Sequence, residues 1–336
     1  MAFLLAVDQG STKTAALVGD DAGRILGVGY AGGACHSSDG MDMAMSMVRS
    51  ACGEAMRQAG ASAADIALLV GGLTGADWDY EYPLLEDALI RTIGVPSVRV
   101  CNDCVIAQRG GTDAGHGVVL CAGTAFNAAV QTPDGGRFIF GYYVNDEDMG
   151  GTSIGKAAVV AVCNAHAGIG PPTRLTGLVL GFYRVPTVDE LLFRRINGKL
   201  RPYKDAAPLV FEAARAGDPA AVGILERHGE SVARYAIAGL RRIGDAGLRT
   251  DVVLSGSIFK AKDRILQRSI AGKLAMEAPQ ANVVDALYEP VVGAYLLGLD
   301  EIRGAKFPMR GESLLKSASR FDLLRMANNK EEGGNP

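Results

Sequence analysis

The sequence predicts an α/β protein made of two similar units. Residues 7–24 and 120–137 align without a gap, so that Gly10 falls on Gly123. Each copy runs from an apolar strand through a Gly/Ser/Thr turn, a second strand and an Asp/Gly turn into a third strand, which is the pattern of a β-meander. Strands then alternate with helices, and this predicts a partly parallel sheet covered by helices. Chance similarity between short glycine-turn hairpins is the alternative explanation.

The other elements are expected in chain order. In the first unit we expect strands at residues 25–30, 66–71 and 97–101 and helices at residues 42–59 and 82–93. In the second unit we expect a strand at residues 138–143, helices at residues 154–167, 187–196, 206–216 and 220–243, and a strand at residues 251–256. The predicted segments are residues 1–115, residues 116–302 with a helical insertion, and residues 303–336. A ligand is expected in the cleft where the two units meet.

The last predicted segment, residues 303–336, holds a basic amphipathic stretch from Leu314 to Met326 and then a polar end. We expect a C-terminal helix followed by a frayed polar tail.

Composition narrows the class of protein. The chain has 336 residues, of which 48% are hydrophobic and 21% charged, and this is ordinary globular usage. Its net charge of −3 gives no electrostatic reason to expect a nucleic acid or an anionic membrane as partner. The apolar start runs into Asp8 without a basic leader, and no apolar run reaches the roughly 20 residues that span a bilayer. We expect a cytoplasmic protein with a small-molecule substrate.

The six cysteines are scattered along the chain. Only Cys101 and Cys104 form a close pair, and no second pair completes a zinc site. We expect reduced thiols that pack as small hydrophobic side chains.

The first glycine turn carries groups that suit phosphate. Gly10 lets the backbone approach an anion, and hydroxyl and ammonium donors follow in Ser11, Thr12, Lys13 and Thr14. Asp8, at the end of the first strand, suits the Mg²⁺ that accompanies ATP. The second copy has Cys121 at the position of Asp8, so only one unit carries the acid. A plain hairpin is the alternative reading of this turn.

A second carboxylate follows the strand at residues 97–101. Asp103, after Asn102, precedes a helix-like stretch and would project into the cleft, where it could accept a proton from an attacking hydroxyl. Alternatively, it caps that helix.

An ordered set of motifs gives these features a common context. The motifs are Asp8 to Thr14, Gly72 to Asp77, Asn102-Asp103, Ala122 to Thr124, Gly170 to Thr173 and Val252 to Phe259. Over residues 4–300 this set resembles the BadF/BadG/BcrA/BcrD ATPase family, and within it the N-acetylglucosamine and glucosamine kinases. The resemblance implies two actin-like (ribonuclease H-like) domains with an interdomain cleft for ATP and substrate. It also implies ATP-dependent phosphorylation of an amino sugar, and we expect a homodimer.

The resemblance implies a role for each site residue. Asp103 would be the catalytic base, and Asp8 would bind the metal. The groups expected at ATP are Gly10, Ser11, Thr12, Lys13, Thr14, Gly123, Thr124, Ser255, Gly256, Ser257 and Phe259. The groups expected at the sugar are His36, Asn102, Asp103, Asp146 and Glu147.

Three departures from the family pattern affect the site. Phe126 stands where these kinases have a small residue near the phosphates. The segment Tyr142 to Gly151, which contains an acidic loop at Asp146 to Asp148, replaces their Trp-containing segment and Gly-Asp-Glu-Gly-Ser-Gly motif. His36 replaces an Asn that contacts the sugar.

Two other functions stay open on the sequence alone. One is an ATP-driven activator of a dehydratase or reductase, which would hold an iron–sulfur cluster through two cysteines per subunit, here Cys121 and Cys163. The other is a nucleotide-binding regulator without catalysis, which Phe126 and the acidic loop would favour.

Overall fold

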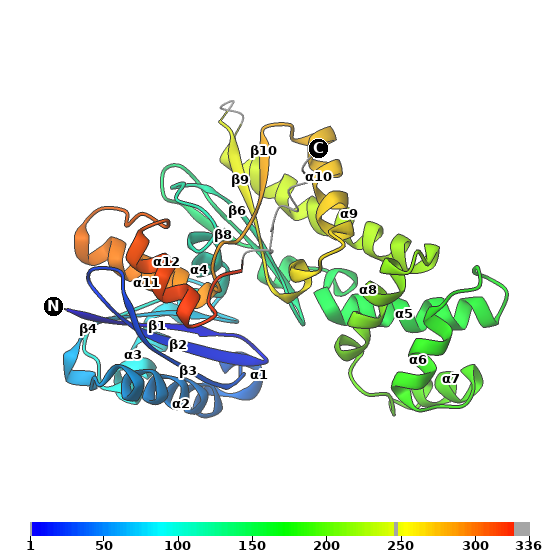
Figure 1. Cartoon of the computed structure of the whole chain (residues 1–336), viewed down its shortest axis with the longest axis horizontal. Coiled ribbons are helices and arrows are strands. Elements are labelled where there is room, and N and C mark those ends of the chain that lie inside the picture. The colour runs from blue at the N-terminus through cyan, green and yellow to red at the C-terminus, as the bar shows by residue number, and fades with distance from the viewer. Residues whose placement is uncertain (1, 245–247, 326–336) are drawn as a thin grey trace, which may run out of the picture.

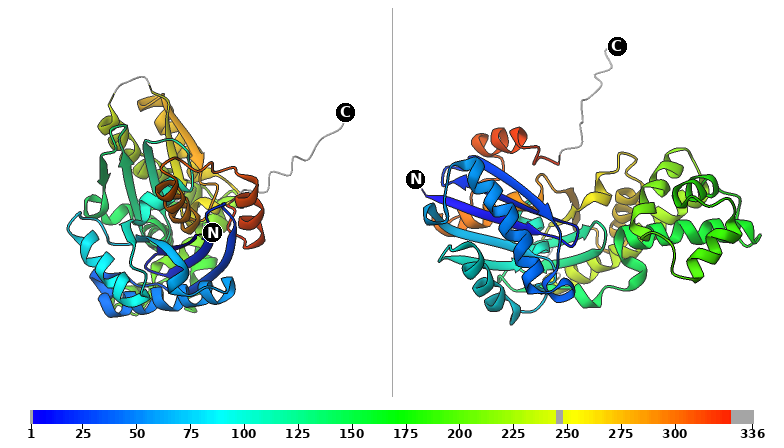
Figure 2. Two further views of the ribbon diagram at one scale, coloured as in Figure 1. Left: turned by 90° about the vertical axis from the view of Figure 1, so that its left-hand side faces the viewer. Right: turned by 90° about the horizontal axis from the view of Figure 1, so that it is seen from below.

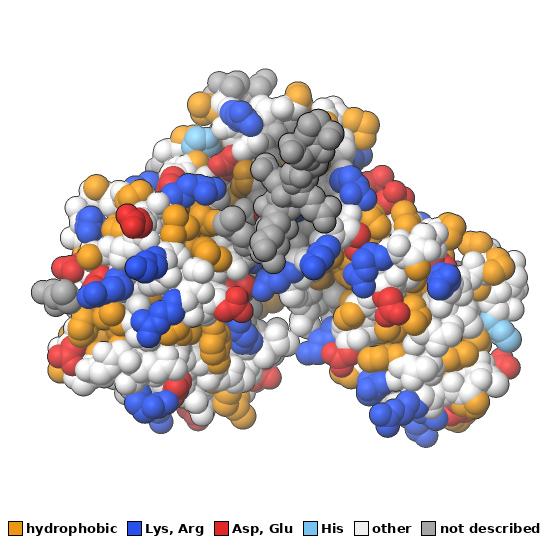
Figure 3. Space-filling model, viewed as in Figure 1, with side chains coloured by type: hydrophobic (Ala, Val, Ile, Leu, Met, Phe, Trp, Pro, Cys, Tyr) orange, Lys and Arg blue, Asp and Glu red, His pale blue; other side chains and the backbone are white. Residues whose placement is uncertain are grey.

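The computed structural model describes residues 2–244 and 248–325 and has two lobes (Figure 1). The first lobe holds the N-terminal sheet. The second holds another sheet, from which a group of helices extends to one side. The space-filling view shows the surface hollowed between the lobes (Figure 3). Within the described ranges, no helix is both long enough and apolar enough to cross a membrane.

The first sheet has five strands in the order β3-β2-β1-β4-β5. They are β1 (Phe3–Gln9), β2 (Lys13–Asp20), β3 (Ile25–Gly32), β4 (Ile66–Leu73) and β5 (Val98–Asn102). The strands β1, β2 and β3 are antiparallel neighbours, whereas β1, β4 and β5 run parallel. The first three form the expected meander, and the parallel strands are reached through helical connections.

The second sheet repeats this path. Its strands are β6 (Gly117–Ala122), β7 (Phe126–Gln131), β8 (Arg137–Ile139), β9 (Thr250–Ser255) and β10 (Ala281–Asp285), in the order β10-β9-β6-β7-β8. Counted from the opposite edge, this is the order of the first sheet, and β6, β9 and β10 are again parallel. The α/β class with two duplicated units is confirmed, because chance similarity of two hairpins would not reproduce a five-stranded order. The strand expected at residues 138–143 is shorter than predicted.

Helices α2 (Met41–Ala59) and α3 (Glu81–Ile93) cover one face of the first sheet. Helix α2 approaches β3 closely because β3 carries Gly27 and Gly29: a Cβ atom at Gly29 would lie 2.1 Å from the carbonyl oxygen of Ala51. The buried side of α2 consists mainly of small and flexible residues, namely Ala44, Met45, Val48, Ala51, Cys52 and Ala55. Both helices agree with the predicted ranges.

The helical insertion lies between β8 and β9. Its helices are α5 (Gly150–His166), α6 (Leu175–Tyr183), α7 (Val188–Ile196), α8 (Ala207–Arg215) and α9 (Pro219–Ile243). Helix α9 starts at a cap in which the Asp218 side chain accepts a hydrogen bond from Ala221 N. Its later turns pack on β6 and β7, while α6 and α7 extend the lobe outward (Figure 1). The prediction omitted only α6 from this group.

Two crossing helices join the lobes. Helix α4 (Asp103–Arg109) follows β5, and its Cys104 and Ala107 pack among residues of β6, β7 and β9. Helix α11 (Pro290–Arg303) comes after the second sheet, yet it packs on the first through side chains such as Tyr295. The expected second segment, residues 116–302, therefore ends with a helix that lies on the first sheet. Helix α10 (Ile265–Glu277) links β9 to β10.

The C-terminal segment also packs on the first lobe. Helix α12 (Glu312–Arg320) lies beside β3 (Figures 1 and 2), where the Ser317 hydroxyl oxygen accepts a hydrogen bond from Ile25 N. The predicted stretch ended at Met326, which lies with the polar tail outside the described residues.

A buried arginine anchors this segment. Arg109, which is 5% exposed, donates hydrogen bonds to both carboxylate oxygens of Asp300 at 2.7 and 3.0 Å and to the Phe307 carbonyl at 2.6 Å. It thereby ties α4 to the end of α11 and to the chain that leads into α12.

We expect Arg109→Ala to lower the free energy of unfolding by about 3 kcal/mol, because it leaves the Asp300 carboxylate without its buried partner. Urea denaturation followed by circular dichroism measures this loss. Arg99→Ala is the matched control, since the Arg99–Glu301 pair also reaches α11 but is exposed and should contribute less than about 1 kcal/mol. Equal losses in the two variants would contradict the anchoring role of Arg109.

Candidate active site

The carboxyl ends of the central parallel strands bring the predicted carboxylates together. Asp8 in β1 is level with Gly72 in β4, and Gly72 is level with Cys101 in β5. Asn102 and Asp103 follow at once, so Asp8 and Asp103 share one edge of the first sheet. The residues that follow the carboxyl ends of parallel strands lie along the same edge of the sheet, and α/β sheets bind their ligands at this edge.

Asn102, not Asp103, caps helix α4. Its Oδ1 accepts a hydrogen bond from Cys104 N at 2.9 Å, and its Nδ2 donates to Ala76 O at 3.2 Å and to Asp77 Oδ1 at 2.7 Å. The side chain is completely buried. The alternative in which Asp103 serves as the cap is therefore wrong, and the Asp103 carboxylate is available for another role.

Asp103 has the surroundings of a proton acceptor. Its Oδ1 is out of contact with solvent and has no hydrogen-bond partner within residues 2–244 and 248–325. Burial raises the pKa of Asp103 from 3.8 to about 6; repulsion from Asp77 adds to the effect, and the N–H of Cys104 and the Thr74 hydroxyl oppose it. Near neutral pH this carboxylate is mostly ionised and can accept a proton.

Asp8 is close enough to Asp103 for their charges to interact. Burial raises the pKa of Asp8 from 3.8 to about 7, with repulsion from Asp103 as the next cause and attraction to Lys13 opposing both. Glu289 raises this pKa further and Arg325 lowers it. Two carboxylates in a crowded cleft favour a bound cation, and Mg²⁺ commonly binds through one or two carboxylates together with phosphates. The donor set therefore fits the expected metal.

The first glycine turn divides its donors between solvent and protein. Ser11, Thr12 and Lys13 are exposed, and Gly10 N donates to Lys13 O at 2.9 Å. Thr14 is buried, and its hydroxyl donates to Gly32 O at 2.9 Å. The turn also packs against Gly33, where a Cβ atom would lie 2.2 Å from Thr12 N. The exposed donors are those that a phosphate could reach.

The second turn is held by the start of α5. Gly123 O accepts a hydrogen bond from Gly151 N, and Thr124 O accepts from Thr152 N and from the Thr152 hydroxyl. Gly150 has a φ of +53°, and a Cβ atom there would lie 2.5 Å from Ala125 O. The turn is thus fixed at the beginning of a long helix.

Phe126 packs in the core of the second lobe. It is the first residue of β7, is 4% exposed, and packs against Tyr235 with ring centroids 5.2 Å apart. Successive strand residues point to opposite faces, so a large residue here fills the core. Phe126 thus has a packing role, and its expected position near the phosphates stays a prediction.

The third predicted nucleotide segment follows β9. Gly256 has a φ of +107°, and a Cβ atom there would lie 2.1 Å from Ala122 O, so glycine is required. Ser257 is exposed and begins the short helix η5 (Ser257–Lys260), whereas Ser255 is buried. Phe259 is 6% exposed and packs in the core of the second lobe.

His36 belongs to a chain of contacts that leads to Asn102. Its Nε2 lies 3.3 Å from Glu81 Oε1, and the other oxygen of Glu81 accepts hydrogen bonds from Asp77 N and Trp78 N, each at 2.9 Å. Asp77 in turn bonds Asn102. Neither Asp77 nor Glu81 was predicted to have a role, although Asp77 ends the motif Gly72 to Asp77.

The acidic loop has two exposed carboxylates and one buried. Asp146 and Glu147 are exposed in the short helix η3 (Asp146–Asp148). Asp148 is completely buried and accepts hydrogen bonds from Ser231, from Arg234 at 3.2 Å and from Tyr235 at 2.9 Å. Asp148 therefore anchors the loop to α9.

The loops of the two lobes also meet. Trp78 stacks on Tyr142 with ring centroids 6.1 Å apart, and a Cβ atom at Gly141 would lie 2.7 Å from Asp77 Oδ2. The His36–Asn102 contact chain thus ends beside the second lobe.

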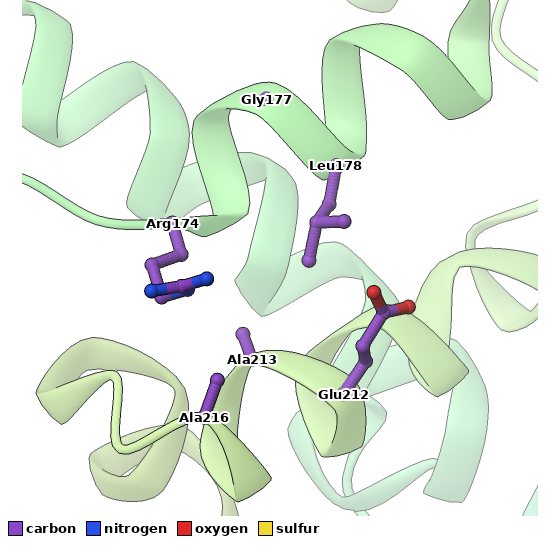
Figure 4. A pocket seen from close by; sticks show the side chains of 6 residues that line it. All are labelled: Arg174, Gly177, Leu178, Glu212, Ala213 and Ala216. Atoms are coloured by element: carbon purple, nitrogen blue, oxygen red, sulfur yellow. The ribbon is translucent and has the colours of Figure 1, made fainter.

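Three cavities of the described part of the chain lie in the helical insertion, and none of them is lined by Asp8 or Asp103. One, of 370 Å³, is formed between α6 and α8 (Figure 4). Its lining residues are Arg174, Gly177, Leu178, Glu212, Ala213 and Ala216. A second, of 620 Å³, runs between α5 and α9 and includes Glu147 among its lining residues. A third, of 310 Å³, is lined by residues at 183–184, 194 and 199–201.

The cysteines are free thiols. Cys121, at the end of β6, interacts with the buried Cys104 of α4, whereas Cys163 lies in the last turns of α5. In the described part of the chain, no three His, Cys, Asp or Glu side chains are grouped so as to hold a metal ion by themselves.

A family model described as the BadF/BadG/BcrA/BcrD ATPase family matches residues 5–298. The chain belongs to this ATPase family. One relative of this chain, the N-acetylmuramic acid/N-acetylglucosamine kinase of Clostridium acetobutylicum, is 24% identical over 196 residues, which are 57% of this chain and 63% of the relative. The match thus spans less than two thirds of that relative. Glucosamine kinase GspK of Vibrio cholerae is 23% identical over 244 residues, 71% of this chain and 80% of the relative.

Solved structures show the same fold as this BadF/BadG/BcrA/BcrD ATPase. A candidate N-acetylglucosamine kinase from Chromobacterium violaceum has a TM-score of 0.67 at 23% identity, covering 88% of this chain and 99% of that chain. A ROK family glucokinase from Streptomyces griseus, in complex with glucose and AMPPNP, has a TM-score of 0.56 at 20% identity, covering 87% and 98%. The two-domain arrangement expected from the sequence is confirmed.

The raised pKa of Asp8 gives a stability prediction. Because the folded chain holds this proton more tightly than the unfolded chain, ionisation of Asp8 destabilises the fold as the pH rises from about 4 to about 7. Without nucleotide or metal, Asp8→Asn should raise the free energy of unfolding by about 2 kcal/mol at pH 8 and by much less at pH 5. Urea denaturation at the two pH values measures the difference. Asp42→Asn, on the exposed side of α2, controls for loss of a charge; an Asp8→Asn effect that is independent of pH would refute the assignment.

Proposed function

We propose that this protein is an ATP-dependent kinase that transfers the γ-phosphate to a hydroxyl of an amino sugar. The observation that carries the proposal is the Asp103 carboxylate, whose Oδ1 is buried without a partner in the described residues beside Asp8 and whose pKa is about 6. The names of the two kinase relatives support an amino sugar as the substrate.

The proposed reaction divides the work between the lobes. The exposed donors of the turn at residues 10–13 and the backbone of the turn at residues 123–125 bind the phosphates, while the adenosine lies against residues 255–257. Asp8 holds Mg²⁺, which neutralises phosphate charge. Asp103 accepts the proton of the attacking sugar hydroxyl, and the new bond to phosphorus forms as the bond to the leaving ADP oxygen breaks.

The proposed sugar site uses Asn102, His36 and the exposed part of the acidic loop. Asn102 keeps Asp103 and the Asp77 loop in place, and His36 approaches the same loop: a Cβ atom at Gly75 would lie 3.5 Å from His36 Cε1. Asp146 and Glu147 have no role in anchoring the loop comparable to that of Asp148, so their carboxylates are available to a substrate. They suit hydroxyl or ammonium groups and repel a carboxylate.

Asp103→Asn should lower kcat with glucosamine by roughly 10²–10⁴-fold and leave ATP binding within about threefold of the original, because the amide cannot accept the substrate proton. ADP release in a coupled assay measures kcat, and titration with ATP in the absence of sugar measures binding. A kcat within threefold of the unsubstituted enzyme would exclude Asp103 as the base.

The pH profile gives a second check on the base. Since Asp103 must be ionised to accept a proton and its pKa is raised to about 6, kcat/KM for the sugar should fall tenfold per pH unit well below pH 6 and level off above about pH 7. Residual activity of Asp103→Asn should lose this dependence on Asp103. A profile that is flat from pH 5 to pH 8 would contradict the proposal.

The substrate is tested through the acidic loop. Joint replacement of Asp146 by Asn and Glu147 by Gln should raise the KM for glucosamine and leave the KM for ATP unchanged. The unsubstituted enzyme should use glucosamine at least as well as N-acetylglucosamine, and both better than N-acetylmuramic acid, which carries a carboxylate. The double replacement should reduce the difference in kcat/KM between glucosamine and N-acetylmuramic acid. Unchanged sugar kinetics would mean that the loop is a solvated turn without ligand contact.

A further inference from the structure

The C-terminal segment, residues 303–325, lies beyond the family match, which ends at residue 298. It is nevertheless part of the folded core: Phe307, Met309, Leu314 and Leu323 are buried against the first lobe. After α12 the chain returns to the folded protein and pairs with residues 287–289, just before α11.

Backbone pairing fixes the end of this segment beside the start of α11. Glu289 N donates to Leu323 O at 2.9 Å, and Arg325 N donates to Leu287 O at 2.8 Å. An isolated β-bridge pairs Tyr288 with Leu324. Three consecutive residues of the segment are thus held in register, so the position of Arg325 is set by the backbone.

The Arg325 side chain enters the turn that follows β9. Only 4% of it is exposed. Its Nη1 donates to Ser255 Oγ at 2.8 Å, and its Nη2 donates to Gly256 O at 2.5 Å. Ser255 and Gly256 belong to the proposed nucleotide site, so a cation from outside the family match lies within that site.

The guanidinium has donors left over. Arginine carries five N–H groups, and two are used on Ser255 and Gly256. Its Nε is out of contact with solvent and has no hydrogen-bond partner in the described residues. The nearest carboxylate, Glu289 Oε1, is 3.8 Å from Nε, and this same oxygen accepts a 2.5 Å hydrogen bond from Lys260. Glu289 is therefore shared with Lys260, and it lies beyond hydrogen-bond distance of Arg325 Nε.

The local charge balance leaves room for an anionic ligand. Burial lowers the pKa of Arg325, and the carboxylates of Glu289 and Asp8 only partly offset that cost. A buried guanidinium is stabilised best by a close anion, and its planar donors match phosphate oxygens.

We propose that Arg325 binds phosphate groups of the adenine nucleotide, so that the C-terminal segment completes the nucleotide site. This inference rests on the proposed function for the identity of the ligand as an adenine nucleotide. Arg325 is bonded to the second lobe and held by backbone to the start of α11, which packs on the first. It therefore adds a fixed positive charge at the turn after β9, and the proposed site gains phosphate donors that the two glycine turns alone do not supply.

The test compares ligands that differ only in phosphate. Adenosine, ADP and ATP are titrated without sugar, each nucleotide with Mg²⁺, against the full chain and its Arg325→Ala and Arg325→Gln variants. Because a charge-assisted hydrogen bond is lost, ADP and ATP should bind about 10- to 100-fold more weakly to both variants, and adenosine should bind within about twofold of the original. Arg325→Lys should recover part of the affinity for ATP.

Arg320→Ala is the matched control, since Arg320 is an exposed arginine at the end of α12, and it should leave all three affinities unchanged. Thermal melts show whether the Arg325 variants stay folded, and Arg325→Gln preserves most of the packing if Arg325→Ala does not. Equal weakening of adenosine and ATP would overturn the proposal in favour of a purely structural role. Tighter binding of all three ligands would overturn it in favour of a side chain that blocks the site.

These measurements need no phosphate transfer, so they separate the two proposals. If the chain binds ATP through Arg325 but phosphorylates no amino sugar, only the proposed function fails. If the unsubstituted chain binds neither ADP nor ATP, both fail.

Discussion

The rest of the site depends on the side chain of Asn102. This one amide joins the end of β5, the first turn of α4 and the loop that ends at Asp77, and it does so completely shielded from water. Because the Asn102 side chain accepts the hydrogen bond from Cys104 N at the start of α4, the Asp103 carboxylate is not needed as the cap of this helix. Burial raises the pKa of Asp103, repulsion from Asp77 adds to the rise, and a carboxylate with a raised pKa is suited to accept a proton near neutral pH.

The fold could be predicted largely from the repeat. Each copy of the repeat predicts an antiparallel meander that is followed by parallel strands, and a duplicated unit is expected to fold in the same way twice. The two sheets do have the same strand order. The location of α11 could not be predicted, because nothing local in an apolar helix after the second sheet says that it packs on the first. Helix α6, with residues Leu175–Tyr183, was also missed; it is short and nearly all apolar, so periodicity gives a weak signal.

Site residues could be predicted from the sequence where the end of a strand sets their position. They could not be predicted where the direction of the side chain, inward or outward, decides whether a ligand can reach it. Asp8 and Asp103 follow from the parallel register. Thr14 and Phe259 were both predicted to lie at ATP, yet both side chains are buried, and the Thr14 hydroxyl is bonded to Gly32 O. Nothing in the sequence indicated that Arg325 lies beside the turn after β9, because its hydrogen bond to Ser255 joins residues far apart in the sequence.

The close contact of α4 and α11 determines which parts of the molecule move together. A Cβ atom at Gly293 would lie 1.8 Å from the carbonyl oxygen of Ile106, so the two helices touch backbone to backbone at this point. Both helices also contribute side chains to the core of the first lobe, and Arg109 of α4 bonds Asp300 of α11. Helix α11 is therefore a rigid part of the first lobe, although the chain reaches it after the second sheet. A change in the angle between the lobes has to take place where α4 packs against β6, β7 and β9.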